Sequence, residues 1–138
     1  MKKDHEIKDG ERTVDRLGAL QDAVRAFNEA REWRQFHSPK NLAMALMIEA
    51  AELAEPFRWD DDERSWQRAR SDDGRAALSK EMADVLLLLL SLAEYNGIDL
   101  VGAARDKLAL NEQRYPAERA RGRADKYTAY QRESDADE

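Results

Sequence analysis

The chain has 138 residues, a formal net charge of −6 and no cysteine, which suits one cytoplasmic domain and excludes disulfides and thiolate metal sites. The acidic balance argues against a sequence-independent grip on DNA or RNA, so no nucleic-acid polymer is expected as a partner. The charged start of the chain differs from a secretory signal, and the longest apolar run, residues 85–90, is far shorter than the roughly 20 residues that cross a bilayer, so no membrane association is expected.

The sequence predicts an all-α protein with four main helices. Alanine, leucine, glutamate and arginine dominate, whereas glycine and proline are scarce and no segment alternates as a strand would. Residues 1–12 are polar and aperiodic, and we expect a flexible N-terminal segment there. The first helix is expected over residues 13–33, where apolar residues recur at three- and four-residue spacing, namely Leu17, Leu20, Val24 and Phe27.

The second helix is predicted over residues 39–55. Ser38 offers an N-cap, Pro39 suits the first helical position, and Pro56 ends the helix. The stretch from 58 to 74 is polar, and we expect a long link there with one short helical turn around Trp66.

Two further helices complete the predicted fold. The third covers residues 75–96 and stops at Gly97, and the fourth runs from its cap Asp99 to about Tyr115. Residues 131–138 are expected to form a flexible tail. Amphipathic helices joined by mostly short links predict a four-helix bundle that fills one domain, residues 13–130.

Two acidic pairs stand where apolar stripes should be. At about 100° per residue, Glu49 falls within the stripe of the second helix and Glu52 borders it. Glu81 and Asp84 repeat this arrangement on the third helix. An ionised carboxylate loses several kcal/mol of hydration on burial, and neither helix offers a basic residue at a matching stripe position. The pattern therefore predicts a divalent cation, Mg²⁺ or Mn²⁺, whose ligands are Glu49, Glu52, Glu81 and Asp84.

The same acids are compatible with two arrangements that lack a magnesium ion. They could rim the core and point to solvent, which is the usual state of a single glutamate on such a helix. They could also hold a di-iron centre, but this is disfavoured because such a site normally uses Glu-x-x-His pairs. The chain has only His5 and His37, and neither follows one of these acids by three residues.

The inward stripe of the fourth helix ends in hydrogen-bond donors. Lys107 and Asn111 lie within about 40° of Leu100, and Arg114 falls nearby. Cationic groups suit phosphate oxygens and an amide can read a base, although a buried stem with a solvated head is the commoner use of such residues. Two interpretations also remain for Trp33, Trp59 and Trp66. Each either covers the core by packing against it or provides a flat surface on which a base stacks.

The motif Glu49-x-x-Glu52, then 28 intervening residues, then Glu81-x-x-Asp84 resembles the signature of the all-α MazG-type nucleotide pyrophosphohydrolases. The flanking segments resemble the dCTP pyrophosphatases of that superfamily, and the resemblance covers residues 17–128. These segments are Glu32-Trp33-Arg34-Gln35-Phe36-His37, Glu52-Leu53-Ala54-Glu55 with Phe57 and Trp59, Asn111 with Arg114-Tyr115-Pro116, and Lys126-Tyr127-Thr128.

The resemblance implies a helical fold that assembles as a homodimer or homotetramer with active sites across the pair. It implies Mg²⁺-dependent hydrolysis of a nucleoside triphosphate, dCTP or a modified dCTP, to the monophosphate and pyrophosphate. Trp33 and Trp59 would flank the base, Asn111 would read it, and Lys107 would meet the phosphates and act in catalysis together with the four acids. The other substrate-binding residues implied by the matching segments are His37, Arg114, Tyr115 and Lys126.

The sequence departs from the family pattern at two positions. Ile48 stands where many members carry a further glutamate, and Val24 stands where the dCTP enzymes have a base-contacting histidine. The rival functions are a dUTP- or dUDP-preferring or broad house-cleaning hydrolase, and a non-catalytic helical dimerisation module.

Overall fold

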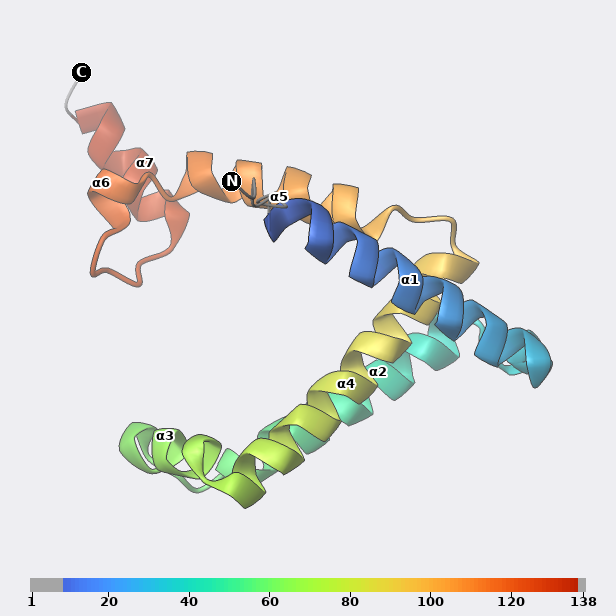
Figure 1. Ribbon diagram of the computed structural model, residues 1–138. Coiled ribbons are helices and arrows are strands. Elements are labelled where there is room, and N and C mark those ends of the chain that lie inside the picture. The colour runs from blue at the N-terminus through green and yellow to red at the C-terminus, as the bar shows by residue number, and fades with distance from the viewer. Residues whose placement is uncertain (1–8, 137–138) are drawn as a thin grey trace, which may run out of the picture. The chain divides into compact units, whose positions relative to one another are not determined.

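The computed structural model describes the backbone of residues 9–136 and the side chains of residues 16–132 and 136. All regular structure in this part of the chain is helical (Figure 1), which confirms the predicted all-α class. The chain forms two compact units, and the boundary between them in the sequence falls between Ile98 and Asp99. The single domain expected over residues 13–130 stays a prediction.

Between residues 9 and 98, the first unit contains four α-helices and two short 3-10 helices. In chain order these are α1 (Asp9–Ala30), η1 (Trp33–Phe36), α2 (Pro39–Ala54), η2 (Glu55–Phe57), α3 (Asp62–Arg70) and α4 (Asp72–Tyr95). Residues 9–12 of the segment expected to be flexible are therefore helical, and residues 1–8 lie outside the described residues. At its other end α1 stops three residues before the predicted position, and Glu32 follows in the left-handed region with φ 53°.

Helices α2 and α4 form the centre of this unit. They run side by side in opposite directions (Figure 1) and pack along their length. The Ser38 hydroxyl accepts a hydrogen bond from the Asn41 backbone N–H at 3.2 Å, which confirms the predicted cap of α2. Gly97 has φ 62° just beyond α4, as the predicted helix stop requires. The buried apolar residues of this pair are Leu42, Leu90 and Ala93.

The polar link between the second and third helices contains more helix than the single short turn predicted around Trp66, because α3 occupies nine residues of it. The Asp61 carboxylate accepts a hydrogen bond from the Arg64 N–H at 2.9 Å and so caps α3. The Arg68 guanidinium donates two hydrogen bonds, of 2.6 and 3.0 Å, to the Asp60 carboxylate. Helix α4 then begins at Asp72, three residues earlier than predicted, because Ser71 caps it through the Gly74 N–H at 3.1 Å.

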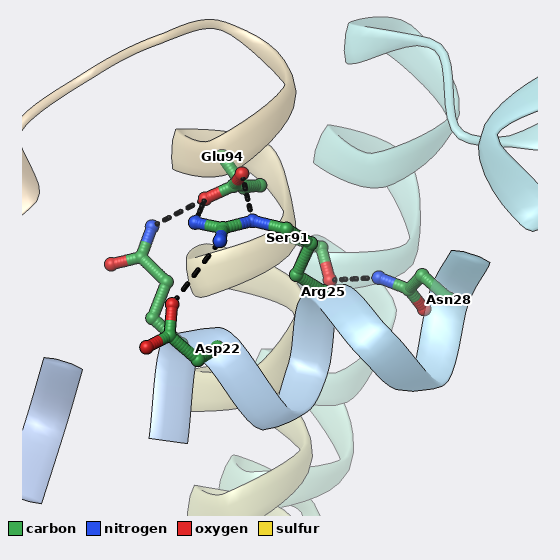
Figure 2. A network of polar contacts seen from close by, with 6 residues as sticks. Asp22, Arg25, Asn28, Ser91 and Glu94 are labelled. Carbon is green, nitrogen blue, oxygen red and sulfur yellow. Dashed lines mark hydrogen bonds and ion pairs between the residues drawn. The ribbon is translucent and has the colours of Figure 1, made fainter. Parts of the chain in front are cut away.

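Polar contacts fasten α1 to the C-terminal half of α4 (Figure 2). Both oxygens of Glu94 receive hydrogen bonds from the Arg25 guanidinium, at 2.5 and 3.0 Å, and one of them also receives a bond from Gln21. Further along the same interface the Asn28 amide donates to the Ser91 hydroxyl at 3.0 Å. These contacts fix which residues of α1 face the space beside α2 and α4.

The second unit contains α5 (Leu100–Arg114), α6 (Ala117–Ala120) and α7 (Tyr127–Ala136). The Asp99 carboxylate caps α5 through the Gly102 N–H at 3.0 Å, as predicted. Tyr130 is buried and its ring meets that of Tyr115 edge-on at 5.9 Å. Because α7 runs to Ala136, most of the tail expected to be flexible is helical, and residues 137 and 138 lie outside the described part.

Within residues 9–136, no individual helix combines the length and apolar character needed to cross a bilayer, and α4 and α5 meet that criterion only when taken as a pair.

Candidate metal and nucleotide site

Three of the four predicted metal ligands converge between α2 and α4. Glu49, Glu52 and Glu81 each contribute one carboxylate oxygen to a group whose members all lie within 4.8 Å of one another. The oxygens around one Mg²⁺ ion lie about 3–4 Å apart, so small side-chain rotations would bring these three to ligand distance. The i, i+3 spacing on α2 and the antiparallel packing of α4 explain why the three residues meet.

Asp84 lies beside this group and not within it. Its side chain is 40% exposed and its Oδ2 atom is 3.7 Å from Lys80 Nζ. It nevertheless lines the same pocket as Glu49. The structure thus places Asp84 one helical turn from Glu81, at the edge of the carboxylate cluster formed by Glu49, Glu52 and Glu81.

Lys80 contacts this cluster, which the sequence pattern did not predict. Its ammonium donates a hydrogen bond to Glu81 Oε1 at 2.9 Å. Lys80 stands outside the apolar stripe, but its flexible side chain turns the ammonium toward Glu81 and Asp84, so a basic residue partly neutralises the acids without occupying a stripe position. Its side chain remains 70% exposed, so the ammonium neutralises the cluster only from its outer edge.

The donor set of the cluster fits a divalent cation. The second oxygen of Glu81, Oε2, is buried and receives no hydrogen bond from the part of the chain that the structure describes. A buried carboxylate oxygen without a partner carries an uncompensated desolvation cost. Carboxylate oxygens are the ligands that Mg²⁺ and Mn²⁺ prefer, so an ion held here would satisfy Glu81 together with Glu49 and Glu52.

Electrostatics within the cluster support the same conclusion. Burial raises the pKa of Glu49, and the neighbouring negative charges of Glu52, Asp84 and Glu81 raise it further, while Lys80 acts in the opposite direction. The ionised form of Glu49 is thus disfavoured by its surroundings. A cation bound among these carboxylates would remove the repulsion that causes much of this shift.

A pocket of about 430 Å³ opens beside the carboxylate cluster. It lies between α1, α2 and α4, with η1 at its rim, and belongs entirely to the first unit. Its walls are mostly apolar, and its volume is adequate for a nucleobase. The residues that line it are Leu20, Ala23, Val24, Phe27, Asn28, Trp33, His37, Ala45, Glu49, Asp84, Leu87, Leu88 and Ser91.

Aromatic side chains form the outer part of this pocket. The Trp33 ring contacts Phe27 edge-on with centroids 5.5 Å apart and His37 with centroids 5.8 Å apart. His37 Nδ1 lies 3.3 Å from the Tyr95 hydroxyl. These contacts orient Trp33 and His37, two residues predicted to bind substrate, along the wall of the pocket.

Trp59 is not brought to this pocket. It follows η2, its side chain is 83% exposed, and Arg58 stacks on it at 4.8 Å. Trp66 lines a different hollow, next to α3, and is also exposed. Within the first unit, therefore, Trp33 is the tryptophan placed to contact a base, and the flanking role of Trp59 stays a prediction.

The remaining predicted residues belong to the second unit. Lys107 on α5 and Lys126 before α7 are exposed, and Asn111 is half-buried. The Arg114 guanidinium lies over the Tyr127 ring at 4.7 Å, and Tyr115 packs beside the same ring. Arg114 and Tyr115 thus have packing partners within their own unit, and the substrate contacts of all five residues stay predictions.

Sequence reasoning missed Asn28 and Ser91, two buried polar residues of the pocket. They are only 6% and 5% exposed. A signal was present in the sequence, since Asn28 follows Val24 by four residues and Ser91 follows Leu88 by three, which places both in apolar stripes.

Comparison with known proteins gives a consistent result. Over 102 residues, 74% of this chain, the chain is 45% identical to dCTP pyrophosphatase 1 of Bos taurus and 44% identical to that of Homo sapiens. It spans about 60% of the length of these curated relatives. No protein-family model matches the chain.

A solved structure extends the comparison to nearly a whole protein. The crystal structure of a pyrophosphatase from Archaeoglobus fulgidus matches with a TM-score of 0.68 and 32% identity, covering 84% of this chain and 98% of that one. The match includes both sequence and fold, so the likeness suggested by the paired acid motifs is confirmed. The chain belongs to the MazG-like pyrophosphatase family, close to the dCTP pyrophosphatases.

Proposed function

We propose that this protein is a Mg²⁺-dependent nucleoside triphosphate pyrophosphohydrolase that acts on dCTP or a modified dCTP. The observation that carries the proposal is the convergence of Glu49, Glu52 and Glu81 beside a pocket large enough for a base. The names of the relatives, dCTP pyrophosphatase and pyrophosphatase, support the reaction and the base.

The four acids have distinct tasks in this proposal. Glu49, Glu52, Glu81 and Asp84 hold Mg²⁺, which when bound offsets phosphate charge and orients a water molecule. Glu52, the exposed member of the cluster, takes the proton from the attacking water. Glu49 and Asp84 also line the pocket, so they position the phosphates relative to the base.

The pocket residues bind the nucleoside and keep water from the reaction. Trp33 offers a flat ring for stacking, and His37 provides a polar contact at the rim. Asn111 reads the base, and Lys107 stabilises the charge that develops on the pyrophosphate leaving group. Trp59, Arg114, Tyr115 and Lys126 complete the substrate site.

We further propose that the active form is a homodimer or homotetramer. Large apolar side chains on the outer faces of α2 and α4 are exposed in the single chain, and a second copy would bury them. Trp59, 83% exposed, would then be available to a substrate site shared between subunits. The apolar residues concerned are Met44, Met47, Ile48, Met82 and Leu86.

A panel of nucleoside triphosphates, assayed with and without Mg²⁺ and with products identified as mono- or diphosphates, tests the proposal. We expect dCMP and pyrophosphate from dCTP, only with Mg²⁺. Preference for dUTP or activity on dUDP would indicate a deoxyuridine nucleotide hydrolase, and equal turnover of non-standard nucleotides would indicate a house-cleaning enzyme.

The metal ligands are tested by Glu81→Gln and Asp84→Asn. Both variants should lose turnover and retain a helical circular-dichroism spectrum. Glu55→Gln is the matched control, because Glu55 follows Glu52 by three residues and is exposed. No hydrolysis by the wild type and no rise of its Tm with Mg²⁺ would instead indicate a non-catalytic dimerisation module.

A further inference from the structure

The inner part of the pocket holds two polar residues that the proposed reaction does not use. Asn28 on α1 and Ser91 on α4 are 6% and 5% exposed, and both line the pocket of about 430 Å³. Their neighbours in the lining are mostly apolar, among them Val24, Leu87 and Leu88. Buried polar groups in apolar surroundings cost free energy unless each finds a partner, so this pair needs an explanation.

The hydrogen bonds of the pair determine what it offers to a ligand. The Asn28 amide donates to Ser91 Oγ at 3.0 Å (Figure 2). A hydroxyl that accepts this bond still has its own hydrogen to donate. Asn28 is therefore anchored to α4 through Ser91, whose own hydrogen can be donated to a ligand within the pocket.

The other polar groups of the pocket are already engaged. Glu49 and Asp84 belong to the proposed metal site, and His37 Nδ1 lies 3.3 Å from the Tyr95 hydroxyl. Among the described residues that line the pocket, Asn28 and Ser91 are the most buried polar ones. A ligand that fills the apolar part of the pocket would meet this pair with its edge.

We infer that the Asn28–Ser91 pair is a specificity-determining element of the base pocket, in which Ser91 donates a hydrogen bond to the base and Asn28 holds the hydroxyl in place. The inference rests on the proposed function. A fixed donor favours a base that presents an unprotonated ring nitrogen and a carbonyl oxygen, as cytosine does. It disfavours one that presents a ring N–H at that edge, as uracil does.

The test compares dCTP with dUTP, whose bases differ in this hydrogen-bonding edge. For the wild type, Ser91→Ala and the double variant Asn28→Ala/Ser91→Ala, the ratio of kcat/KM for dCTP to that for dUTP is measured. We expect the ratio to fall about tenfold or more in both variants, mainly through KM for dCTP, because a binding contact is lost. The double variant removes both partners and so leaves no unpaired buried group.

Arg25→Ala is the matched control for a purely structural role. Arg25 joins the same two helices through Glu94 (Figure 2). It is not among the residues that line the pocket. We expect it to lower Tm and to leave the dCTP to dUTP ratio unchanged. An unchanged ratio in folded Ser91→Ala and in the folded double variant would overturn the inference, as would a wild-type preference for dUTP.

Binding of dCMP and dUMP, measured by calorimetry without metal, separates this inference from the proposed function. If the wild type does not hydrolyse nucleotides but prefers dCMP, and Ser91→Ala abolishes that preference, the proposed reaction fails and the role of the pair stands. If the wild type binds neither monophosphate, the inference is wrong. Turnover with equal base preference in wild type and variants leaves the reaction intact and excludes the pair as its specificity element.

Discussion

Glu94 on α4 accepts hydrogen bonds from the Arg25 guanidinium of α1 with both of its carboxylate oxygens, at 2.5 and 3.0 Å. Such a two-point contact is stronger and more directional than a single hydrogen bond. It lies next to the Asn28–Ser91 bond along the same interface. The contact therefore contributes to the stability of the packing between α1 and α4.

Replacing Glu94 by glutamine should make the protein less stable at neutral pH, by a few degrees in Tm. The hydrogen bond from Arg25 lowers the pKa of Glu94. A carboxyl with a lowered pKa contributes stability above its unfolded-state pKa, and that stability is lost as the pH falls through the folded-state pKa. Melting curves from pH 8 to pH 3 should show the wild-type advantage shrinking toward the acid end. A difference in Tm that stays constant over this range would contradict the assignment.

Replacing Glu49 by glutamine should raise Tm in EDTA and abolish the rise in Tm that Mg²⁺ causes. The raised pKa of Glu49 shows that burial and the charges of Glu52, Asp84 and Glu81 disfavour its ionised form, so a neutral amide relieves the repulsion. The measurement is thermal unfolding with EDTA and with Mg²⁺. Glu55→Gln is the control, because Glu55 is exposed and follows Glu52 by three residues. It should change neither the Tm in EDTA nor the rise in Tm with Mg²⁺. A lower Tm of Glu49→Gln in EDTA would show that the cluster is not strained without its ion.

Replacing Trp33 by alanine should raise KM for dCTP by about tenfold, because stacking on an aromatic ring contributes about 1–3 kcal/mol per base. Trp33→Phe should recover much of that loss. In Trp59→Ala the result depends on assembly, since Trp59 lies outside the pocket of its own unit. We expect a raised KM at protein concentrations where the oligomer forms, measured by kinetics alongside light scattering. An unchanged KM in Trp33→Ala would exclude this pocket as the base site.

Two glycine substitutions should have opposite effects on stability. A Cβ atom at Gly74 would overlap the carbonyl oxygen of Arg68, which is backbone and cannot turn away. Gly74→Ala should therefore lower Tm by several degrees and disturb the corner between α3 and α4. Nothing lies within 4 Å of a Cβ atom at Gly18, and alanine is preferred over glycine in a helix by about 1 kcal/mol. Gly18→Ala should thus raise Tm, and equal effects of the two changes would contradict the packing of this corner.

Local signals in the sequence were sufficient to predict four of the described α-helices and the convergence of Glu49, Glu52 and Glu81. Ser38 and Asp99 act as caps because a short side chain reaches a backbone N–H three residues on, which depends on sequence alone. The positions of Glu49 and Glu81 follow from helical periodicity, since a residue in an apolar stripe turns toward the partner helix.

The remaining features depend on contacts that local patterns do not specify. Helix α3 is polar, and the hydrogen bond that Arg68 donates to Asp60 joins residues eight positions apart in the sequence. The Asn28–Ser91 bond joins positions 63 residues apart. Each partner was visible as a polar residue in an apolar stripe, but their pairing required the packing of α1 on α4.

The contact between Lys80 and the acids of α4 has a consequence for how an ion would enter. Lys80 acts as a counter-ion that belongs to the chain itself. Part of the negative charge of the carboxylates is therefore already neutralised before a metal ion binds. Lys80 would have to release the two carboxylates for Mg²⁺ to bind among them, and its flexible stem would keep the ammonium beside the site. The released ammonium would then be available to a phosphate, so binding of the ion and attraction of a phosphate would be coupled.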